Sequence, residues 1–372
     1  MVSKKIDRNR LLSKKITSID MENGSSVYEL VRSFDGSSFQ SRNIYLCSSI
    51  YERMLSDPKR PTIMLGMSGA LIAGGLRKIL ADMVKNGYVD VIATTGAIIY
   101  QDFYQALGNS HYMGSVDAND EILWKNQIDR IYDTYVDEKK FRKTDVFISK
   151  IVDELEPRGY STREFMGWLG QQISDENSIL YNASKYGVPV FCPAIADSSI
   201  GIGLAVHFHR NGNSNRRPSG RGVKQVTGTS GRFYLDTIQD NYEIAQIVSA
   251  SNRTAAIFLG GGVPKNYIND SVVMSDMIFK DTPGHEYAIQ ITMDQPNWGG
   301  LSGSTLKEAQ SWGKIDVEAK KATANVELTV GLPLVYGYVH HNGTGKKRKR
   351  LVFQWGERGK LISIKAVGEK TA

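Results

Sequence analysis

The sequence predicts a doubly wound, Rossmann-like α/β fold, in which a mostly parallel sheet carries helices on both faces. Short, continuous apolar runs with the length of strands alternate along the chain with longer stretches of helical spacing. Strands of that composition are typical of a sheet that is buried on both sides. Several runs also stop at glycine or small hydroxyl residues, as expected where a strand turns into a helix.

The first unit of this pattern is a β-α-β unit. Residues 62–65 form an apolar strand, 66–69 a turn, 71–85 a helix, and 89–93 a second strand that stops at Thr94. The alternation then recurs, with helices expected at 161–172, 177–185 and 236–249 and strands at 188–192, 254–259 and 287–292.

The two ends of the chain differ from this middle part. Residues 1–45 are polar, with a weak helical pattern at 26–32. After Pro333 the pattern predicts strands at 335–339, 351–355 and 361–364, with Asn342 and Gly343 in a turn. We therefore expect an N-terminal arm at 1–45, a main domain at 46–335 and a small, β-rich, basic C-terminal appendage at 336–372.

Composition indicates a globular protein. The chain has 372 residues, of which 41% are hydrophobic and 23% charged, enough for one large core or two modest ones. It contains no run of about eighteen apolar residues and no apolar secretory region near Met1, so we expect a cytoplasmic protein without a membrane segment. Cys47 and Cys192 are far apart and lack metal-ligand spacing, so no metal site is predicted.

The formal net charge of +7 is concentrated in two stretches, 207–224 and 346–350. Both are rich in Lys or Arg, and we expect both to be exposed loops. Neither carries the interleaved aromatic residues on which nucleic-acid bases stack, so nucleic-acid binding is disfavoured. An acidic protein or an acidic neighbouring subunit is an equally good partner for these charges.

Small and hydroxyl residues follow several of the predicted strands. Ser68 and Gly69 follow the first, Thr95 and Gly96 the second, and three glycines at 260–262 follow strand 254–259. Asp197 comes shortly after strand 188–192. In an open α/β sheet these ends lie on one edge, where helix N-termini bind anions, which suits a dinucleotide. The spacing does not match the G-x-G-x-x-G fingerprint, and tight turns explain the same glycines.

The stretch 308–315 contains the best candidate for a nucleophile. Lys314 stands near Trp312, behind Gly313 and downstream of Glu308. A lysine attacks a carbonyl or imine carbon as a neutral amine, so it needs surroundings that disfavour its charge, and an aromatic wall supplies them. The competing interpretation is a solvated surface lysine beside a packing tryptophan.

Taken together, these segments resemble the deoxyhypusine synthase family. The matching pieces are 65–77, 89–95, 193–201, 259–265 and 308–315, with Ser-Trp-Gly-Lys-Ile at 311–315 as the most specific. The resemblance implies an NAD-binding α/β homotetramer with active sites between subunits. Enzymes of this family use NAD to oxidise spermidine, hold the butylamine part as an imine on the motif lysine, pass it to an acceptor amine, and reduce the product.

Carried over by position, the resemblance makes Lys314 the imine-forming lysine, Trp312 its aromatic neighbour and Glu308 the carboxylate that holds a substrate ammonium. The cofactor would be NAD, and the residues expected to bind it come from the strand ends and from two later positions: Ser68, Gly69, Thr94, Thr95, Gly96, Asp197, Gly261, Gly262, Ser302 and Glu327.

Three positions depart from the family pattern. Asn266 stands where the family has a histidine that takes a proton from the substrate, and an amide cannot act as a base. Leu301 and Ile202 stand where the family has acidic residues that bind the amine. An ammonium that meets them loses charge-assisted hydrogen bonds of about 1.5–3 kcal/mol each, so the pocket is expected to prefer an amine other than spermidine. Asp294 is a local carboxylate that could compensate, and the competing interpretation is a solvated loop aspartate.

The first hypothesis is therefore an NAD-dependent aminoalkyl transferase that takes an aminobutyl group from a polyamine. The altered positions favour a free diamine acceptor, as in homospermidine synthesis, over a protein lysine of the translation initiation factor 5A type. The alternative is a catalytically silent protein of the same fold that binds NAD or a polyamine. The residues leave open which amine is the donor and what the two basic stretches contact.

Overall fold

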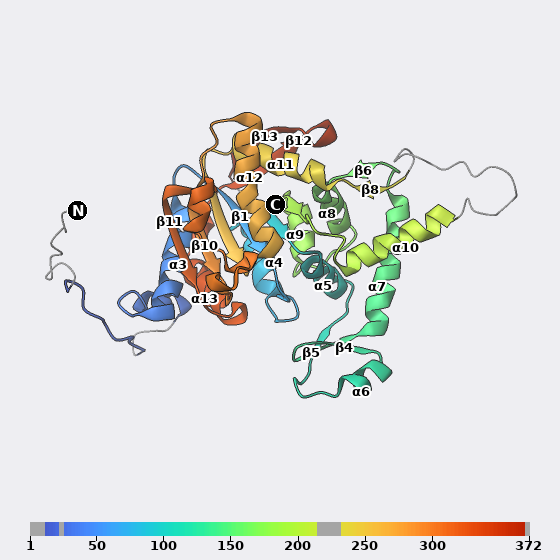
Figure 1. Cartoon of the computed structure of the whole chain (residues 1–372), viewed down its shortest axis with the longest axis horizontal. Coiled ribbons are helices and arrows are strands. Elements are labelled where there is room, and N and C mark those ends of the chain that lie inside the picture. The colour runs from blue at the N-terminus through green and yellow to red at the C-terminus, as the bar shows by residue number, and fades with distance from the viewer. Residues whose placement is uncertain (1–11, 22–25, 214–231, 369–372) are drawn as a thin grey trace, which may run out of the picture.

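The computed structural model describes residues 12–21, 26–213 and 232–368 (Figure 1). Its centre is a six-stranded sheet with the order β11-β10-β9-β1-β2-β7, in which each neighbouring pair is parallel. The strands are β1 (Thr62–Met67), β2 (Val91–Thr94), β7 (Val190–Phe191), β9 (Thr254–Leu259), β10 (His285–Ile291) and β11 (Ile315–Ala324). The predicted parallel α/β class is confirmed.

Helices cover both faces of this sheet. One hydrophobic cluster joins Ile63 and Leu65 of β1 to the helices on one face, and a second joins Met64 to those on the other. The helices of the first cluster include α2 (Val27–Ser33), α3 (Phe39–Ser56), α4 (Arg77–Lys85), α5 (Gly96–Ala106), α8 (Thr162–Gly170), α9 (Ile179–Tyr186) and α13 (Leu328–His341). The second cluster contains α11 (Thr237–Ala250) and α12 (Gly262–Phe279).

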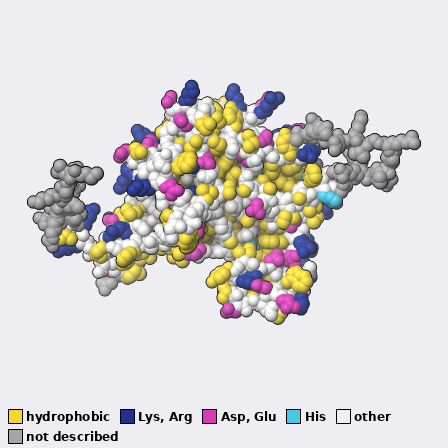
Figure 2. Space-filling model, in the orientation of Figure 1, with side chains coloured by type: hydrophobic (Ala, Val, Ile, Leu, Met, Phe, Trp, Pro, Cys, Tyr) yellow, Lys and Arg dark blue, Asp and Glu magenta, His cyan; other side chains and the backbone are white. Residues whose placement is uncertain are grey.

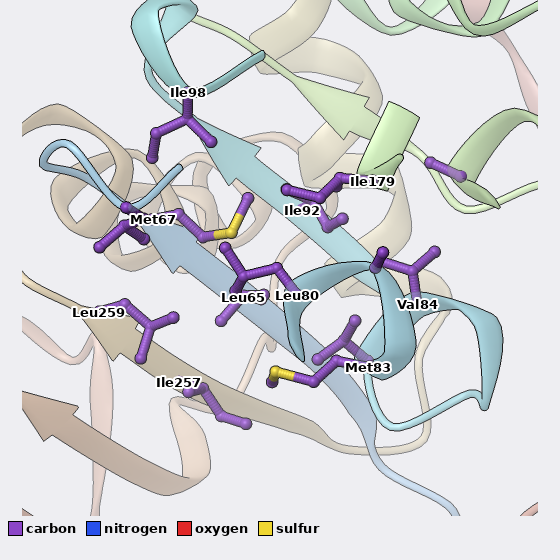
Figure 3. Packing of buried hydrophobic residues seen from close by; sticks show 14 of the residues in the cluster. Leu65, Met67, Leu80, Met83, Val84, Ile92, Ile98, Ile179, Ile257 and Leu259 are labelled. Carbon is purple, nitrogen blue, oxygen red and sulfur yellow. The ribbon is translucent and has the colours of Figure 1, made fainter. Parts of the chain in front are cut away.

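Alternate residues of each strand therefore face different helix layers. Figure 3 shows Leu65, Ile92 and Ile257 of three neighbouring strands packed against Leu80 and Met83 of α4. These side chains are almost completely buried, and each buried aliphatic side chain of this size contributes about 1.5–3 kcal/mol. The sheet and its two helix layers thus hold the strand ends in fixed positions.

Several predicted elements shift at their ends. β1 extends through Gly66 to Met67, where a turn was predicted. The predicted helix at 71–85 begins only at Arg77, because Gly69 and Gly75 have φ values of +93° and +83° and break any helical path before it. The predicted helix at 26–32 is confirmed as α2, which begins with a capping box between Ser26 and Glu29.

The strand predicted at 335–339 is wrong, because these residues belong to α13. Val335, Tyr336, Tyr338 and Val339 are buried, and α13 packs against α2 and α3. Burial around the helix thus overrides the strand preference of alternating valine and tyrosine, even with Pro333 inside the helix. The other two strands of the appendage are confirmed as an antiparallel pair, β12 (Arg350–Trp355) and β13 (Leu361–Val367).

The basic run 346–350 is also not a wholly exposed loop. The guanidinium of Arg348 is 1% exposed and pairs with Asp90 at 2.6 Å, and Arg60 pairs with the same carboxylate at 2.7 Å. Arg350 donates to the carbonyl oxygens of Val84 and Lys85. Two of the five charges therefore bind the protein itself, which removes them from any nucleic-acid surface. Of the other basic stretch, residues 214–224 lie outside the described residues.

One substructure was not predicted. A three-stranded antiparallel sheet with the order β3-β5-β4 lies apart from the main body, below α5 in Figure 1. Its strands are β3 (His111–Met113), β4 (Ile128–Ile131) and β5 (Thr134–Asp137), and α6 (Asp120–Lys125) lies between β3 and β4 in the chain. The chain continues into α7 (Glu138–Ile151), which packs against α10 (Ser199–Asn213), and the short strands β6 (Gly159–Tyr160) and β8 (Tyr234–Leu235) pair nearby.

Among the residues that the structure describes, no helix combines the length and the apolar character needed to cross a membrane.

Candidate active site

The carboxyl ends of β1 and β9 form the topological switch point of the sheet. The chain proceeds from β1 to β2 on one side, whereas β9, β10 and β11 lie on the other, and ligands of open α/β sheets bind at such a point. Here the Gly261 N–H donates to Ser68 Oγ at 2.9 Å, and the Ser68 N–H donates to the Leu259 carbonyl at 3.0 Å. Ser68 and the glycine triplet are therefore in direct contact.

Close backbone approach explains the glycines at this point. A Cβ on Gly261 would lie 2.4 Å from Ser302 Cα, so the triplet and the loop of Ser302 touch. The Gln290 amide joins them by donating to the carbonyls of Gly260 and Ser302, both at 2.9 Å. Gln290 was missed by the sequence analysis, although a glutamine inside an apolar strand is a usable signal.

The remaining cofactor candidates extend this edge in both directions. Met67 pairs with Thr94 in the sheet, so Ser68 and Thr95 directly follow paired residues at the ends of neighbouring strands. A Cβ on Gly96 would lie 2.3 Å from Ser198 Oγ, so Asp197, which is exposed, is on an adjacent turn. On the other side, Glu327 caps α13 by accepting from the Thr329 N–H at 2.8 Å.

This edge fits a dinucleotide. Helices α5 and α12 both begin here, at Gly96 and Gly262, and in the described structure neither first turn has a side-chain cap. Their free N–H groups and helix dipoles favour an anion such as a pyrophosphate. Three or more His, Cys, Asp or Glu side chains placed to hold a metal ion are not found within the described residues.

Lys314 lies at the other end of the sheet, immediately before β11. Gly313, with φ +70°, ends the short helix η4 (Glu308–Trp312), and the Lys314 carbonyl accepts from the His285 N–H at 3.1 Å. The Lys314 Nζ is 2.8 Å from Asp270 Oδ1, and its side chain is 15% exposed. It also lies 5.0 Å from the centre of the Trp312 ring, as a cation–π contact requires.

Asp270 was missed by the sequence analysis. Its second oxygen, Oδ2, accepts from Asn266 Nδ2 at 2.7 Å. The Asp270 carboxylate therefore contacts both Lys314 and Asn266, the residue that stands where the family has a histidine. Both residues lie on α12, four positions apart, and therefore share one helix face. That spacing was the available signal. Gly262 begins the same helix, so α12 runs from the switch point to Lys314, with a rise of about 12 Å between Gly262 and Asp270.

A buried lysine connects the two regions. Lys265 is 1% exposed, and its Nζ donates to Gln290 Oε1 at 3.1 Å and to the Ser304 carbonyl. Burial lowers the pKa of Lys265 to about 8, while the carboxylates of Glu308 and Asp294 act in the opposite direction. Glu308 itself is exposed and accepts from the Thr305 N–H at 3.1 Å.

Leu301 and Ile202, which stand at the two acidic positions of the family, belong to different elements. Leu301, 44% exposed, belongs to η3 (Leu301–Gly303), which packs against α12. Ile202, 55% exposed, belongs to α10, which packs against α5 and α7. Asp294 is half-buried, and its N–H donates to Thr292 Oγ1 at 3.1 Å.

These features define a doubly wound α/β protein with a dinucleotide-type switch point and a lysine joined to it by one helix. The family model described as deoxyhypusine synthase matches residues 29–339. The chain belongs to the deoxyhypusine synthase family, which supports an aminobutyl transferase activity in general terms.

Curated relatives cover nearly the whole chain. "Probable deoxyhypusine synthase 2" of Methanosarcina mazei is 40% identical over 334 residues, which cover 89% of this chain and 91% of that protein. The deoxyhypusine synthase-like protein of Elusimicrobium minutum is 39% identical over 355 residues, or 94% of this chain and 90% of that protein.

A solved structure has the same fold. The crystal structure of a candidate deoxyhypusine synthase from Entamoeba histolytica superimposes with a TM-score of 0.58 at 19% identity, covering 86% of this chain and 95% of that one.

Proposed function

We propose that this protein is an NAD-dependent aminoalkyl transferase that moves an aminobutyl group from a polyamine to an amine acceptor through an imine on Lys314. The observation that carries the proposal is the setting of Lys314. Its Nζ is mostly enclosed, faces an aromatic ring and contacts a carboxylate that can hold its proton. A nucleophilic lysine must give up its proton, and an adjacent general base can accept it.

The residues of the switch point would hold the cofactor. Ser68, Gly261 and Ser302 would line its phosphates and ribose, with Thr95, Gly96 and Asp197 on the side of β2. Bound there, NAD would supply a hydride acceptor for the donor amine and a hydride donor for the product. Glu308 would hold a substrate ammonium, and Trp312 would pack on its carbon chain.

The choice of amine follows from charges that this chain lacks. Leu301 and Ile202 offer no carboxylate to the far amine of spermidine, a loss of about 1.5–3 kcal/mol for each missing charge-assisted bond. Asp294 is the carboxylate near Lys265 that could bind a shorter amine. These residues favour a free diamine acceptor and a homospermidine-like product over a protein lysine of the translation initiation factor 5A type.

We further propose that the active enzyme is a homotetramer whose sites are closed by a second subunit. Trp312 is 68% exposed and Trp298 67% exposed. In a single chain these two rings therefore leave the site open to water. Hydrophobic side chains also gather on the surface around α11 and α12 (Figure 2), where Met277 is 79% exposed. Large exposed apolar patches of this kind typically mark interfaces.

Product analysis tests the proposed activity. The purified protein is incubated with NAD and, in turn, putrescine, spermidine, agmatine and cadaverine, and amine products are identified by mass spectrometry. A new polyamine formed without any protein acceptor supports the small-molecule reaction and names its donor. Product that appears only when a translation initiation factor 5A type protein is added supports the protein acceptor.

The silent-binder alternative is favoured by one observation, the amide of Asn266 where the family has a basic histidine. It predicts that borohydride, added with NAD and each amine, leaves no mass on Lys314. An aminobutyl adduct on the peptide that contains Lys314 excludes it.

A further inference from the structure

We propose that Asp270 is a catalytic residue that accepts and returns the proton exchanged at the Lys314 amine. Asn266 cannot perform this task, because its amide side chain is not a base. This inference rests on the proposed function, because it concerns the formation of the imine on Lys314.

The Asp270 carboxylate contacts both Lys314 and Asn266. Oδ1 lies 2.8 Å from Lys314 Nζ, and Oδ2 accepts from Asn266 Nδ2 at 2.7 Å. The amide of Asn266 thus fixes the orientation of the carboxylate while Oδ1 remains directed at the amine. Since Asp270 is in the middle of the 18-residue helix α12, its backbone is rigid, and precise geometry favours proton transfer.

Neighbouring groups are less suited to this role. The Glu308 carboxylate is assigned to the substrate ammonium in the proposed function, and it accepts from the Thr305 N–H. His285 is fully buried, with Nδ1 2.7 Å from Thr254 Oγ1 and Nε2 3.3 Å from the Ile268 carbonyl. Lys265 is held by Gln290 and Ser304. By contrast, the Asp270 side chain is 40% exposed, so a substrate amine can reach it.

The transfer step balances with one carboxylate. Asp270 takes a proton from the Lys314 ammonium, and the neutral Nζ adds to the iminium carbon of the oxidised donor. Nζ of this adduct loses a further proton, and the departing nitrogen gains one, through the same carboxylate. The bond from carbon to the departing amine then breaks, leaving a protonated imine on Lys314. The proton first taken by Asp270 leaves with the released amine as its ammonium.

The test uses Asp270→Ala and Asp270→Glu in the full-length protein, with Asp276→Asn as a matched control. Asp276 lies on the same helix, is exposed, and accepts from the Thr282 N–H near the helix end. The rate of borohydride-trapped adduct on Lys314 is measured with NAD and the best amine of the panel. NAD affinity and Tm are measured alongside.

We expect Asp270→Ala to lower the trapping rate about a hundredfold, with NAD affinity unchanged. Sodium formate should raise the trapping rate of Asp270→Ala about tenfold, because a small carboxylate can enter the space left by the side chain. Sodium chloride at the same concentration should not raise it. Asp270→Glu should retain more activity than Asp270→Ala. If Asp270→Ala fails to fold, Asp270→Asn preserves the shape and should show the same loss.

Full activity in Asp270→Ala or Asp270→Asn overturns the inference. A loss that neither formate nor Asp270→Glu relieves, in protein that binds NAD normally, overturns it as well, because that result assigns a purely structural role. Absence of adduct in the unmodified protein with every amine is a different result, since it contradicts the proposed function itself.

Discussion

At the scale of single residues, the proposed function depends on how Lys314 keeps and loses a proton. Lys314 has an aromatic ring on one side and the Asp270 carboxylate on the other. In the proposed reaction, the ring covers part of the lysine side chain, and the carboxylate takes the proton that the amine must lose. Asp270 is four residues from Asn266, which the sequence analysis had named. Its contact with Lys314 nevertheless joins two positions that are 44 residues apart in the chain.

Replacement of the nucleophile is the first residue-scale prediction. Lys314→Arg should abolish transfer and leave the NAD affinity nearly unchanged, because arginine stays protonated and cannot form an imine. Product formation and NAD titration measure the two quantities. Turnover at the original rate in this variant contradicts the central role of Lys314.

Substrate choice is the second. Leu301→Asp should raise kcat/KM for spermidine relative to putrescine by about tenfold to a hundredfold, because a new charge-assisted bond contributes about 1.5–3 kcal/mol. Competition between the two amines, followed by mass spectrometry, measures the ratio. Leu301→Asn is the matched uncharged control, and an unchanged ranking in Leu301→Asp means that position 301 does not face the substrate.

At the scale of elements, a stretch can look exposed in the sequence and yet bind the core. The basic run 346–350 precedes and enters β12, and it is held against β1 and the turn before β2 through Asp90. Arg60 and Arg348 both pair with this carboxylate and lower the pKa of Asp90 to about 2, against the effect of burial. The C-terminal hairpin is therefore anchored to the main sheet by a buried ion-pair network.

Loss of that anchor has a measurable cost. Arg348→Ala should lower the free energy of unfolding by about 3–5 kcal/mol, because it leaves the buried Asp90 with one cationic partner fewer. Lys346→Ala, at an exposed position of the same run, should change it by less than about 0.5 kcal/mol. Urea denaturation of both variants measures the difference, and equal effects would mean that Arg348 is not held as described.

At the scale of the whole molecule, the winding of the sheet decides where ligands can bind. The switch between β1 and β9 brings Ser68, Thr95 and Gly261 to one edge from segments almost 200 residues apart. The same winding buries polar groups between the layers. His285 and Asp240, for example, are both fully buried, which makes the stability of the fold depend on pH.

Burial lowers the pKa of His285 to about 4, from an ordinary value near 6.5. Between about pH 6.5 and 4 the unfolded chain binds a proton there that the folded chain does not, so this histidine lowers the free energy of unfolding as the pH falls through that window, by about 3 kcal/mol in total. His285→Gln should remove this contribution, and the difference between the two unfolding curves measures it.

The unfolding curves of wild type and His285→Gln must be compared, because Asp240 changes the free energy of unfolding in the opposite direction as the pH falls. Burial raises the pKa of Asp240 to about 7, so the folded chain keeps a proton that the unfolded chain loses above about pH 4, and this contribution grows as the pH falls. His341→Gln, at an exposed position, is the control, and its curve should keep the contribution of His285. A constant difference between wild type and His285→Gln from pH 7 to 4 contradicts the prediction.

The sequence by itself determined the strands β1, β2, β9 and β10, the parallel α/β class and the small residues at the strand ends. These features depend on local patterns: a strand buried on both faces is apolar wherever it is placed in the sheet. Resemblance to the deoxyhypusine synthase family added the roles expected of Lys314 and its neighbours, which remain predictions.

The tertiary structure alone decided that residues 335–339 are helical, that Arg348 is buried, and that Asp270 contacts Lys314. Each outcome depends on partners far away in the chain. The residues of α13 gain more by packing against α2 and α3 than their own preference for strands can offset, and the arginine charge is tolerated inside because Asp90 neutralises it. The local sequence does not contain these partners. Only the folded structure, which brings distant segments into contact, therefore shows which residues are buried and which form pairs.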